Sequence, residues 1–479
     1  MLRAIVLLSA VCLCSSSRAW ANGRFPRADQ LVAVPGQPER LVLRTTFGLL
    51  FSHDAGQSWD WLCEQAVGFV RQEDPAVAAL ADGSVLAGLS AGLARSSDQG
   101  CSWRFADLSP ANLEIVDLSV RPLEPASAVA LGWERVDGGN AFGYSSRFLY
   151  TLDAGVTWQS YGTGIDSGVL VLTLDVAASD PQRLYASGIR PAARAAALYV
   201  SSDDAQTWSE RPIPFDTPRE QGVYIAAVDP LVPERVYLRT SGAASSRLFV
   251  TDDAGATYEE LFSGRPLLGF ALSPDGADIY AGGLEDGLWV ATRTGRVFEQ
   301  RSALPIQCLL HTANTLYACS NELTGFALGA STDGGREFIA KLHLSEVRGP
   351  LACPAESAGG LCAAQWPGIA ERLAISAEPM APSNPSTPDG GGPAPAGSAP
   401  ASGCSVEPGG GDRGSGPASC LTLLAMVGFC AARPRLSPLY GGAKARYCRG
   451  SALEVTNVGE CLDPSSKPAG GIHLATVNR

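Results

Sequence analysis

An eight-residue pattern recurs along the first three quarters of the chain and limits its fold more than any other feature. The first copy, residues 52–59, reads SHDAGQSW. Further copies lie at residues 96–103, 151–158, 201–208, 251–258, 291–298 and 331–338. The sixth copy has Arg293 in place of Asp. The Asp positions are 40 to 55 residues apart, which is the period of propeller blades rather than of short solenoid coils.

Each octet has the residues of a tight hairpin turn. A Ser or Thr hydroxyl and an Asp carboxylate bond to backbone N–H groups, and Gly adopts positive φ without steric cost. The closing aromatic residue is a large plate that we expect to be buried between neighbouring sheets. A structural role is therefore predicted for Asp54, Trp59, Asp98, Trp103, Asp153, Trp158, Asp203, Trp208, Asp253, Tyr258, Asp333 and Phe338.

The pattern S/T-x-D-x-G-x-S/T-W resembles the Asp-box, or BNR repeat. It is similar to the repeats of sialidases, sortilin-type receptors, xyloglucanases and photosystem assembly-factor propellers. Seven copies in phase imply the architecture of that superfamily. They imply little about chemistry, because those proteins share the turn and not the reaction.

Short apolar runs between the octets supply four strands per unit, which is one blade. We therefore predict an all-β, seven-bladed propeller over residues 22–345. In an antiparallel meander the octets share one face of the disc with the first-to-second turns. The loops that vary in length lie on the other face, where binding sites are usual.

The third unit has the longest of these loops and is the predicted ligand surface. Its aromatic, charged and amide side chains, with one from a later connection on the same rim, are Trp133, Arg135, Asn140, Phe142, Tyr144 and Arg219. The alternative is a solvated hairpin extension that packs only on its neighbour.

The N-terminal sequence, the net charge and the histidine content indicate where the protein acts and which partners it can have. Residues 1–21 have the basic, apolar and small-residue regions of a secretory signal peptide. The net charge of −12 and pI near 4.9 argue against a nucleic-acid partner. The chain has four His, and no pair has zinc-ligand spacing. We expect an exported monomer, at the cell surface or outer membrane or secreted, with no metal or cofactor and with a protein or glycan ligand.

Six of the 13 Cys lie in the repeats and their extension, residues 346–376. They are Cys63, Cys101, Cys308, Cys319, Cys353 and Cys362. We predict three disulfides, with free thiols as the alternative. Cys63 and Cys101 are placed to join adjacent blades, Cys308 and Cys319 to flank a hairpin, and Cys353 and Cys362 to bracket a loop. Six Cys allow fifteen pairings, so the sequence leaves the connectivity open.

The C-terminal quarter differs in composition. Residues 377–418 are rich in Pro, Gly, Ser and Ala and read as a flexible linker. The signature around Cys404, the apolar segment within 419–435 and its basic end resemble C-terminal sorting tags of the MYXO-CTERM type. Membrane contact is expected only there, although the apolar run is shorter than the roughly 20 residues that cross a bilayer. The tail, 436–479, has no clear pattern.

The predicted function is a binding or protein-interaction module, and the rival is an extracellular glycosidase. The sialidase resemblance implies three Arg that hold a carboxylate, and an early Phe-Arg-Ile-Pro-like motif. Here the nearest match is Gly23-Arg24-Phe25-Pro26, in a different arrangement. Xyloglucanases, as the resemblance implies, build their groove between two propellers, and this chain has residues for one. No catalytic residue is assigned.

Overall fold

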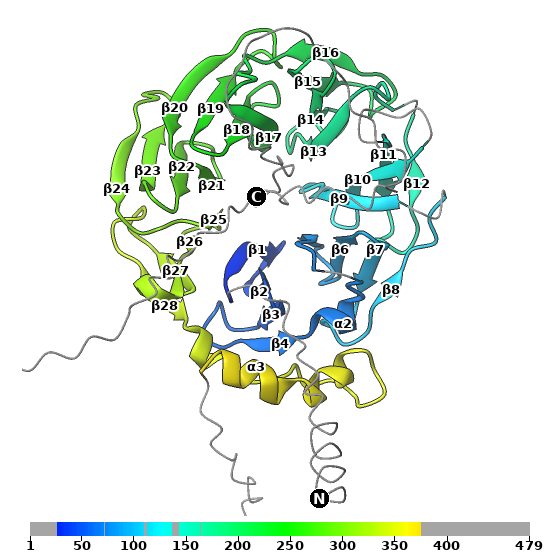
Figure 1. Ribbon diagram of the computed structural model, residues 1–479, viewed down its shortest axis with the longest axis vertical. Helices are drawn as coiled ribbons and strands as arrows, with labels where there is room; N and C mark the ends of the chain where they lie inside the picture. Colours follow the sequence, from blue (N-terminus) through cyan, green and yellow to red (C-terminus); the bar gives the residue numbers. More distant parts are fainter. Residues whose placement is uncertain (1–25, 71, 110–112, 137–142, 163, 375–479) are drawn as a thin grey trace, which may run out of the picture. The chain divides into compact units, whose positions relative to one another are not determined.

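The computed structural model describes residues 26–374, except residue 71 and residues 110–112, 137–142 and 163. Within this part the chain forms seven four-stranded sheets, each antiparallel and in chain order. In Figure 1 the sheets stand side by side around a common axis. The predicted all-β, seven-bladed propeller is confirmed. The signal peptide, linker, sorting tag with Cys404 and tail lie outside the described residues.

The first four blades contain the following strands. Blade 1 comprises β1 (Ala28–Val34), β2 (Gln37–Thr45), β3 (Gly48–Ser52) and β4 (Asp60–Leu62), and blade 2 comprises β5 (Ala76–Ala79), β6 (Val85–Leu89), β7 (Gly92–Ser96) and β8 (Arg104–Phe105). Blade 3 comprises β9 (Leu113–Val120), β10 (Ala128–Arg135), β11 (Tyr144–Thr151) and β12 (Gln159–Ser160). Blade 4 comprises β13 (Leu170–Val176), β14 (Leu184–Arg190), β15 (Ala195–Ser201) and β16 (Ser209–Pro212).

The remaining blades repeat this order. Blade 5 comprises β17 (Glu220–Val228), β18 (Val236–Gly242), β19 (Ser246–Thr251) and β20 (Glu259–Gly264). Blade 6 comprises β21 (Leu267–Leu272), β22 (Asp278–Gly283), β23 (Gly287–Thr292) and β24 (Glu299–Ser302). Blade 7 comprises β25 (Cys308–His311), β26 (Leu316–Cys319), β27 (Leu328–Ser331) and β28 (Ile339–Leu342), with the 3-10 turn η1 (Glu322–Thr324) between β26 and β27.

The core lies between neighbouring sheets. Val129 and Leu131 of blade 3 pack in one buried cluster with Val171 and Leu174 of blade 4, and similar clusters fill the other interfaces. Side chains alternate between the two faces of a strand. Each inner strand is therefore apolar on both faces, which explains the near-continuous apolar runs of the sequence.

The two ends of every blade have different roles. Because each blade is an antiparallel meander, its first-to-second turn and its octet lie at the same end. We call this end the turn face. The second-to-third loops and the blade-to-blade connections form the opposite end, the loop face.

The octets form the predicted turns. In blade 1 the Ser52 hydroxyl donates to the Asp54 carboxylate (2.8 Å) and accepts the Gly56 N–H (2.9 Å). The same carboxylate accepts the backbone N–H and the hydroxyl of Ser58. Gly56 has a φ of 83°, in the left-handed region that glycine adopts without strain. Equivalent bonds recur in the octets of blades 2, 3, 4, 5 and 7.

The octet aromatics are buried to different extents. Trp59 is 1% exposed, and its ring N–H donates to Gly56 O (3.1 Å) and to Lys341 O of blade 7 (3.0 Å). Trp103, Trp158, Trp208, Tyr258 and Phe338 are half-buried. All five pack against the apolar clusters of the blade interfaces, but they are less fully buried than Trp59. The helical segment described next also reaches Trp59, where the backbone N–H of Arg348 donates to Trp59 O.

Residues 343–374, which we call the clasp, run from blade 7 along the outer edge of blade 1 to blade 2. They contain η2 (Leu344–Glu346), η3 (Gly359–Ala364) and α3 (Trp366–Arg372). The backbone of Trp61 in β4 bonds to Gly349 O and to the Leu351 N–H, both at 2.7 Å, so the clasp adds a short parallel pairing to blade 1. Figure 1 shows α3 along the outside of β4.

Two disulfides fix the clasp to the first two blades. Cys63–Cys362 joins η3 to the residue before α2 (Glu64–Val67), and Cys101–Cys353 joins the clasp to the blade 2 octet. Cys308–Cys319 closes the hairpin β25–β26. Three disulfides among these six Cys are confirmed. Of the placements expected from sequence, the hairpin is right. The expected bridges between Cys63 and Cys101 and between Cys353 and Cys362 are wrong. Each cysteine of the first two blades pairs instead with a cysteine of the clasp.

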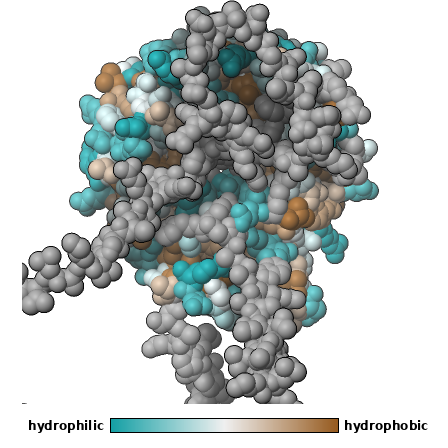
Figure 2. Space-filling view, viewed as in Figure 1, coloured by the Kyte–Doolittle hydropathy of each residue, from teal (hydrophilic) through white to brown (hydrophobic). Residues whose placement is uncertain are grey.

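None of the helices among the described residues is both long enough and apolar enough to span a membrane. The surface in view in Figure 2 carries small hydrophobic areas separated by hydrophilic ones.

Candidate functional site

Side chains on the turn face connect most neighbouring blades. We call the interface between two blades a seam and name it by their numbers. The contacts that cross the turn face are Gln37 to Ala81 O (1/2), Arg95 to Ala154 O (2/3), Arg121 to Asp204 (3/4), Arg183 to Glu234 (4/5), Arg296 to Asp252 (5/6) and Trp59 to Lys341 O (7/1). Six seams therefore have a polar lock.

Seam 4/5 shows how such a lock is built. The Tyr185 hydroxyl donates to Pro233 O in the first turn of blade 5 at 2.6 Å. Arg183, two residues earlier on the same side of β14, pairs with Glu234 of that turn at 3.1 Å. Burial raises the pKa of Tyr185 to about 12, so its hydroxyl remains a donor at any physiological pH.

Seam 6/7 lacks this lock. Among the described residues, no side-chain hydrogen bond or ion pair joins blade 6 to blade 7 across the turn face. A cleft of about 540 Å³ opens there. It is lined by Ser273, Pro274, Asp275, Asp278 and Tyr280 of blade 6 and by His311, Ala313, Asn314, Leu316, Ser331, Thr332 and Gly334 of blade 7. We call it the seam-6/7 cleft.

Seam 6/7 differs from seam 4/5 at the residue that forms the 4/5 lock. The second strands begin RLY at residues 183–185, RVY at 235–237 and DIY at 278–280. Asp278 therefore occupies the position of Arg183 and Arg235. The first turn of blade 7 is also short, at residues 312–315 against 229–235 in blade 5, so it does not reach over Tyr280 as the blade 5 turn reaches over Tyr185.

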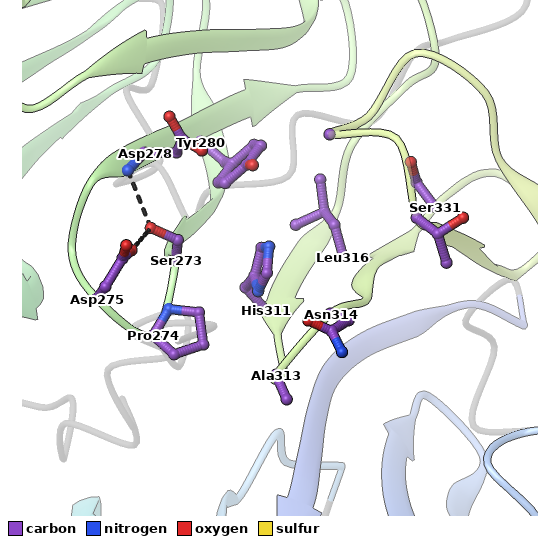
Figure 3. A pocket seen from close by; sticks show the side chains of 12 residues that line it. Ser273, Pro274, Asp275, Asp278, Tyr280, His311, Ala313, Asn314, Leu316 and Ser331 are labelled. Atoms are coloured by element: carbon purple, nitrogen blue, oxygen red, sulfur yellow. Dashed lines mark hydrogen bonds between the residues drawn. The ribbon is translucent and has the colours of Figure 1, made fainter.

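The floor of the cleft is aromatic. The rings of Tyr280 and His311 lie 5.5 Å apart between centroids, tilted by 34°. His311 Nδ1 lies 2.6 Å from Thr312 O. Because a carbonyl oxygen only accepts, Nδ1 carries the proton in this contact. Figure 3 shows the His311 ring in the cleft, between Tyr280 and Leu316.

Two carboxylates stand beside this floor. Asp275 accepts the Ser273 hydroxyl at 2.6 Å and the Ala277 N–H at 3.1 Å, and these bonds lower its pKa. The Asp278 backbone N–H donates to Ser273, but its carboxylate has no hydrogen-bond or ion-pair partner among the described residues. Tyr280 is 3% exposed and its hydroxyl likewise has no such partner. Burial raises the pKa of Tyr280, so this hydroxyl is a donor.

The residues predicted from sequence lie elsewhere, on the loop face. Trp133 ends up in β10 and Tyr144 in β11, because both strands extend into the predicted loop. Trp133 is 4% exposed and donates to Val171 O (2.8 Å), and Tyr144 is 8% exposed. Both pack with Leu170 and Tyr224. The expectation that these rings are open platforms is wrong, since they fill the interface with the next blades.

The polar members of that set are more accessible. Arg135 lies over the Tyr144 ring and donates to its hydroxyl at 3.1 Å. Arg219 is exposed and pairs with Asp216 at 3.0 Å. A ligand role for these two arginines stays a prediction. Asn140 and Phe142 lie outside the described residues.

Three arginines on the second strands of their blades are engaged in structural contacts. Arg44 donates to the carbonyls of Asp74 and Pro75, and Arg239 to Leu267 O. Arg190 is paired with Glu210 and Asp166. These three do not form the carboxylate-binding set that a sialidase resemblance implies. No group of three or more His, Cys, Asp or Glu is placed to hold a metal ion in the part of the chain that the structure describes.

Sequence reasoning missed the seam-6/7 cleft, although the signal was present. Aligning the second strands shows an acid, Asp278, where blades 1, 4 and 5 have Arg40, Arg183 and Arg235. The four-strand pattern by itself gives only the number of blades. Its departures from the repeat, rather than loop length alone, indicate the cleft.

Comparison with known proteins supports the fold and no more. No family model and no curated protein matches the chain. Among solved structures, an ancestral GH74 enzyme is 15% identical with a TM-score of 0.50, over 66% of this chain and 46% of that one. This chain thus spans about half the length of that enzyme.

Two further matches are more distant. The GH74 xyloglucanase from Xanthomonas campestris is 15% identical over 66% of this chain and 64% of its own, with a TM-score of 0.34. YCF48 from Cyanidioschyzon merolae is 12% identical over 62% and 93%, with a TM-score of 0.42. The structural neighbours of this propeller therefore include GH74 glycosidases and YCF48 propellers.

Proposed function

We propose that the chain is an exported Asp-box propeller that acts as a binding module and takes its ligand in the seam-6/7 cleft. The observation that carries this proposal is the missing lock. Six seams are bridged across the turn face, while the seventh presents Tyr280, His311 and Asp278 to solvent. The Tyr280 hydroxyl and the Asp278 carboxylate have no protein partner among the described residues, so both remain available to a ligand.

Export is supported by the signal-like sequence at 1–21 and by three disulfides in the described part of the chain, since disulfides persist in oxidising compartments. We propose further that the linker and the segment around Cys404 tether the propeller to the cell surface. The clasp gives the module a covalently fixed frame, which suits a binding site formed between two blades.

The cleft supports binding better than glycoside hydrolysis. A glycosidase needs a carboxylic acid whose pKa is raised so that it can protonate the leaving group. The hydrogen bonds from Ser273 and Ala277 instead lower the pKa of Asp275, which keeps it ionised. Asp275 is therefore unsuited to the role of general acid.

The test uses an array of glycans and of peptides of defined charge, probed with the full-length protein. We expect binding to some members. The cleft variant H311A/N314A should lose that binding, and the loop-face variant R135A/R219A should retain it. Both pairs remove accessible side chains, so thermal unfolding should confirm that each variant folds.

Three outcomes contradict the proposal. These are binding to no member of the array, loss of binding in the loop-face variant with retention in the cleft variant, and turnover of a fluorogenic sialoside or of an arrayed glycan. The last outcome would instead support the rival glycosidase.

A further inference from the structure

We infer that the seam-6/7 cleft recognises the guanidinium group of an arginine side chain on a partner protein. This inference rests on the proposed function and adds the chemical class of the ligand. It follows from comparing the cleft with the equivalent sites inside the same ring, where the protein has already placed arginines.

At seam 4/5 a guanidinium occupies the equivalent place. Arg183 lies two residues before Tyr185 and joins Asp180 of its own blade (3.2 Å) to Glu234 of the next (3.1 Å). At seam 5/6 Arg235 takes this place two residues before Tyr237, and pairs with Asp252 at 2.5 Å and Asp229 at 3.2 Å. A guanidinium flanked by carboxylates beside a buried tyrosine is thus a recurrent arrangement of these blades.

Blade 6 keeps the tyrosine and the acids but lacks the arginine. Asp278 replaces it, and Asp275 and Tyr280 remain. Two other arginines lie nearby, but neither has an ion pair with Asp278 among the described residues. Arg293 interacts with Asp229 (3.7 Å) and with Asp275 O (3.4 Å). Arg301 lies close enough to Tyr280 to offset part of the rise in the pKa of that tyrosine. The position that is a cation at seams 4/5 and 5/6 is therefore a carboxylate here, ready to receive a cation from outside.

The remaining groups of the cleft suit a planar cation. The Asp278 carboxylate can accept two parallel N–H bonds from one guanidinium. The faces of Tyr280 and His311 provide the aromatic surface on which arginine stacks. Lysine, a point charge, would use the carboxylate but gain less from the planar stack.

The partner is a protein because a single guanidinium fills only part of the cleft. Asn314 and Thr332 at its rim offer hydrogen bonds to the backbone on either side of the arginine. The net charge of −12 favours approach of a basic segment at low ionic strength.

The test is saturation-transfer NMR of two small probes with the full-length protein. The probes are Nα-acetyl-arginine amide and Nα-acetyl-citrulline amide, which share shape and differ in charge. We expect binding of the arginine probe, and about tenfold weaker binding of the citrulline probe, because hydrogen bonds to a charged group are the stronger ones. The variant D278N should lose the preference for arginine, whereas E234Q, which alters a carboxylate at the locked seam 4/5, should keep it.

The results distinguish failure of the arginine inference from failure of the cleft as a binding site. Equal binding of both probes, or an unchanged preference in D278N, overturns the arginine inference. If a neutral saccharide binds instead, and H311A removes that binding, the inference fails while the cleft remains a binding site. If neither the probes nor the array members bind, both the inference and the proposed function fail.

Discussion

Seams 4/5 and 6/7 are built from the same strands and turns, but the turn face is closed at seam 4/5 and open at seam 6/7. At seam 4/5, Arg183 and Tyr185 reach over to Glu234 and Pro233 and close the turn face. At seam 6/7, the residues at the same two positions are Asp278 and Tyr280, and neither has a hydrogen-bond or ion-pair partner on blade 7 among the described residues. One change from arginine to aspartate, with a shorter neighbouring turn, converts a structural contact into a cleft.

The difference also shows which interactions stabilise the interface between two blades. Seam 6/7 keeps a buried apolar cluster that includes Tyr280, Leu288, Ile306 and Leu309. Burial of such side chains contributes about 1.5–3 kcal/mol each, whereas an exposed ion pair contributes about 0–1 kcal/mol. Loss of the polar lock therefore changes the surface of the seam more than its stability, so the ring tolerates an open cleft.

The largest expected effect on the free energy of unfolding comes from the disulfides of the clasp, not from the polar contacts at either seam. C63A/C362A removes one bridge of the clasp. Because Cys101–Cys353 remains, the loop released is only roughly 50 residues, and we expect a loss of about 4 kcal/mol on the chain-entropy scale. Denaturant unfolding measures this loss. The matched variant C308A/C319A opens a sequence separation of 11 residues and should lose about 3 kcal/mol or less.

A smaller loss in the clasp variant than in the hairpin variant would mean that the clasp does not close the ring. The polar locks, and hence their absence at seam 6/7, would then contribute more to stability than about 0–1 kcal/mol each.

A middle-sized effect tests the two tyrosines directly. Y185F removes the donor to Pro233 O and leaves that carbonyl without its bond, so we expect a loss of about 1–2 kcal/mol. Y280F removes a hydroxyl that has no partner among the described residues, and should change the free energy of unfolding by less than about 0.5 kcal/mol. Parallel urea titrations of both variants give the comparison. Equal losses would show that Tyr280 is also locked.

The smallest effect per residue concerns the octets. Burial opposes ionisation of Asp54, but hydrogen bonds from Ser58, Ser52 and Gln57 prevail and hold its pKa at about 2. Its contribution to stability is therefore fully present above its ordinary pKa of 3.8 and is lost as the pH falls through about 2. Blade 6 has Arg293 at this position and lacks the effect.

We therefore expect the stability of the protein to decrease between pH 4 and pH 2, and D54N to show a shallower decrease. Thermal unfolding across this range measures both. An unchanged slope in D54N would mean that the octet carboxylate does not stabilise the folded state through its ionised form.

The repeat made the fold predictable and left the site hidden. Seven octets in phase indicated seven sheets, because the Asp54 and Gly56 chemistry of a turn is local and can be read from eight residues. The cleft depends on which side chains of two blades meet across a seam. That required knowing that Tyr280 faces His311, which lies in the next blade.

The two wrong expectations have similar causes. Trp133 and Tyr144 looked like loop residues because the sequence between them is rich in glycine, yet their strands continue and bury both rings against Leu170. Cys63 and Cys101 pair with the clasp because residues 343–374 return to blades 1 and 2. No local pattern indicates such a return.

A crystal structure of the full-length protein with Nα-acetyl-arginine amide tests the central claim most directly. We predict the guanidinium within hydrogen-bond distance of the Asp278 carboxylate, stacked on the floor that Tyr280 and His311 form. A probe bound on the loop face beside Arg135 and Arg219, or an empty seam-6/7 cleft at saturating probe, would contradict it.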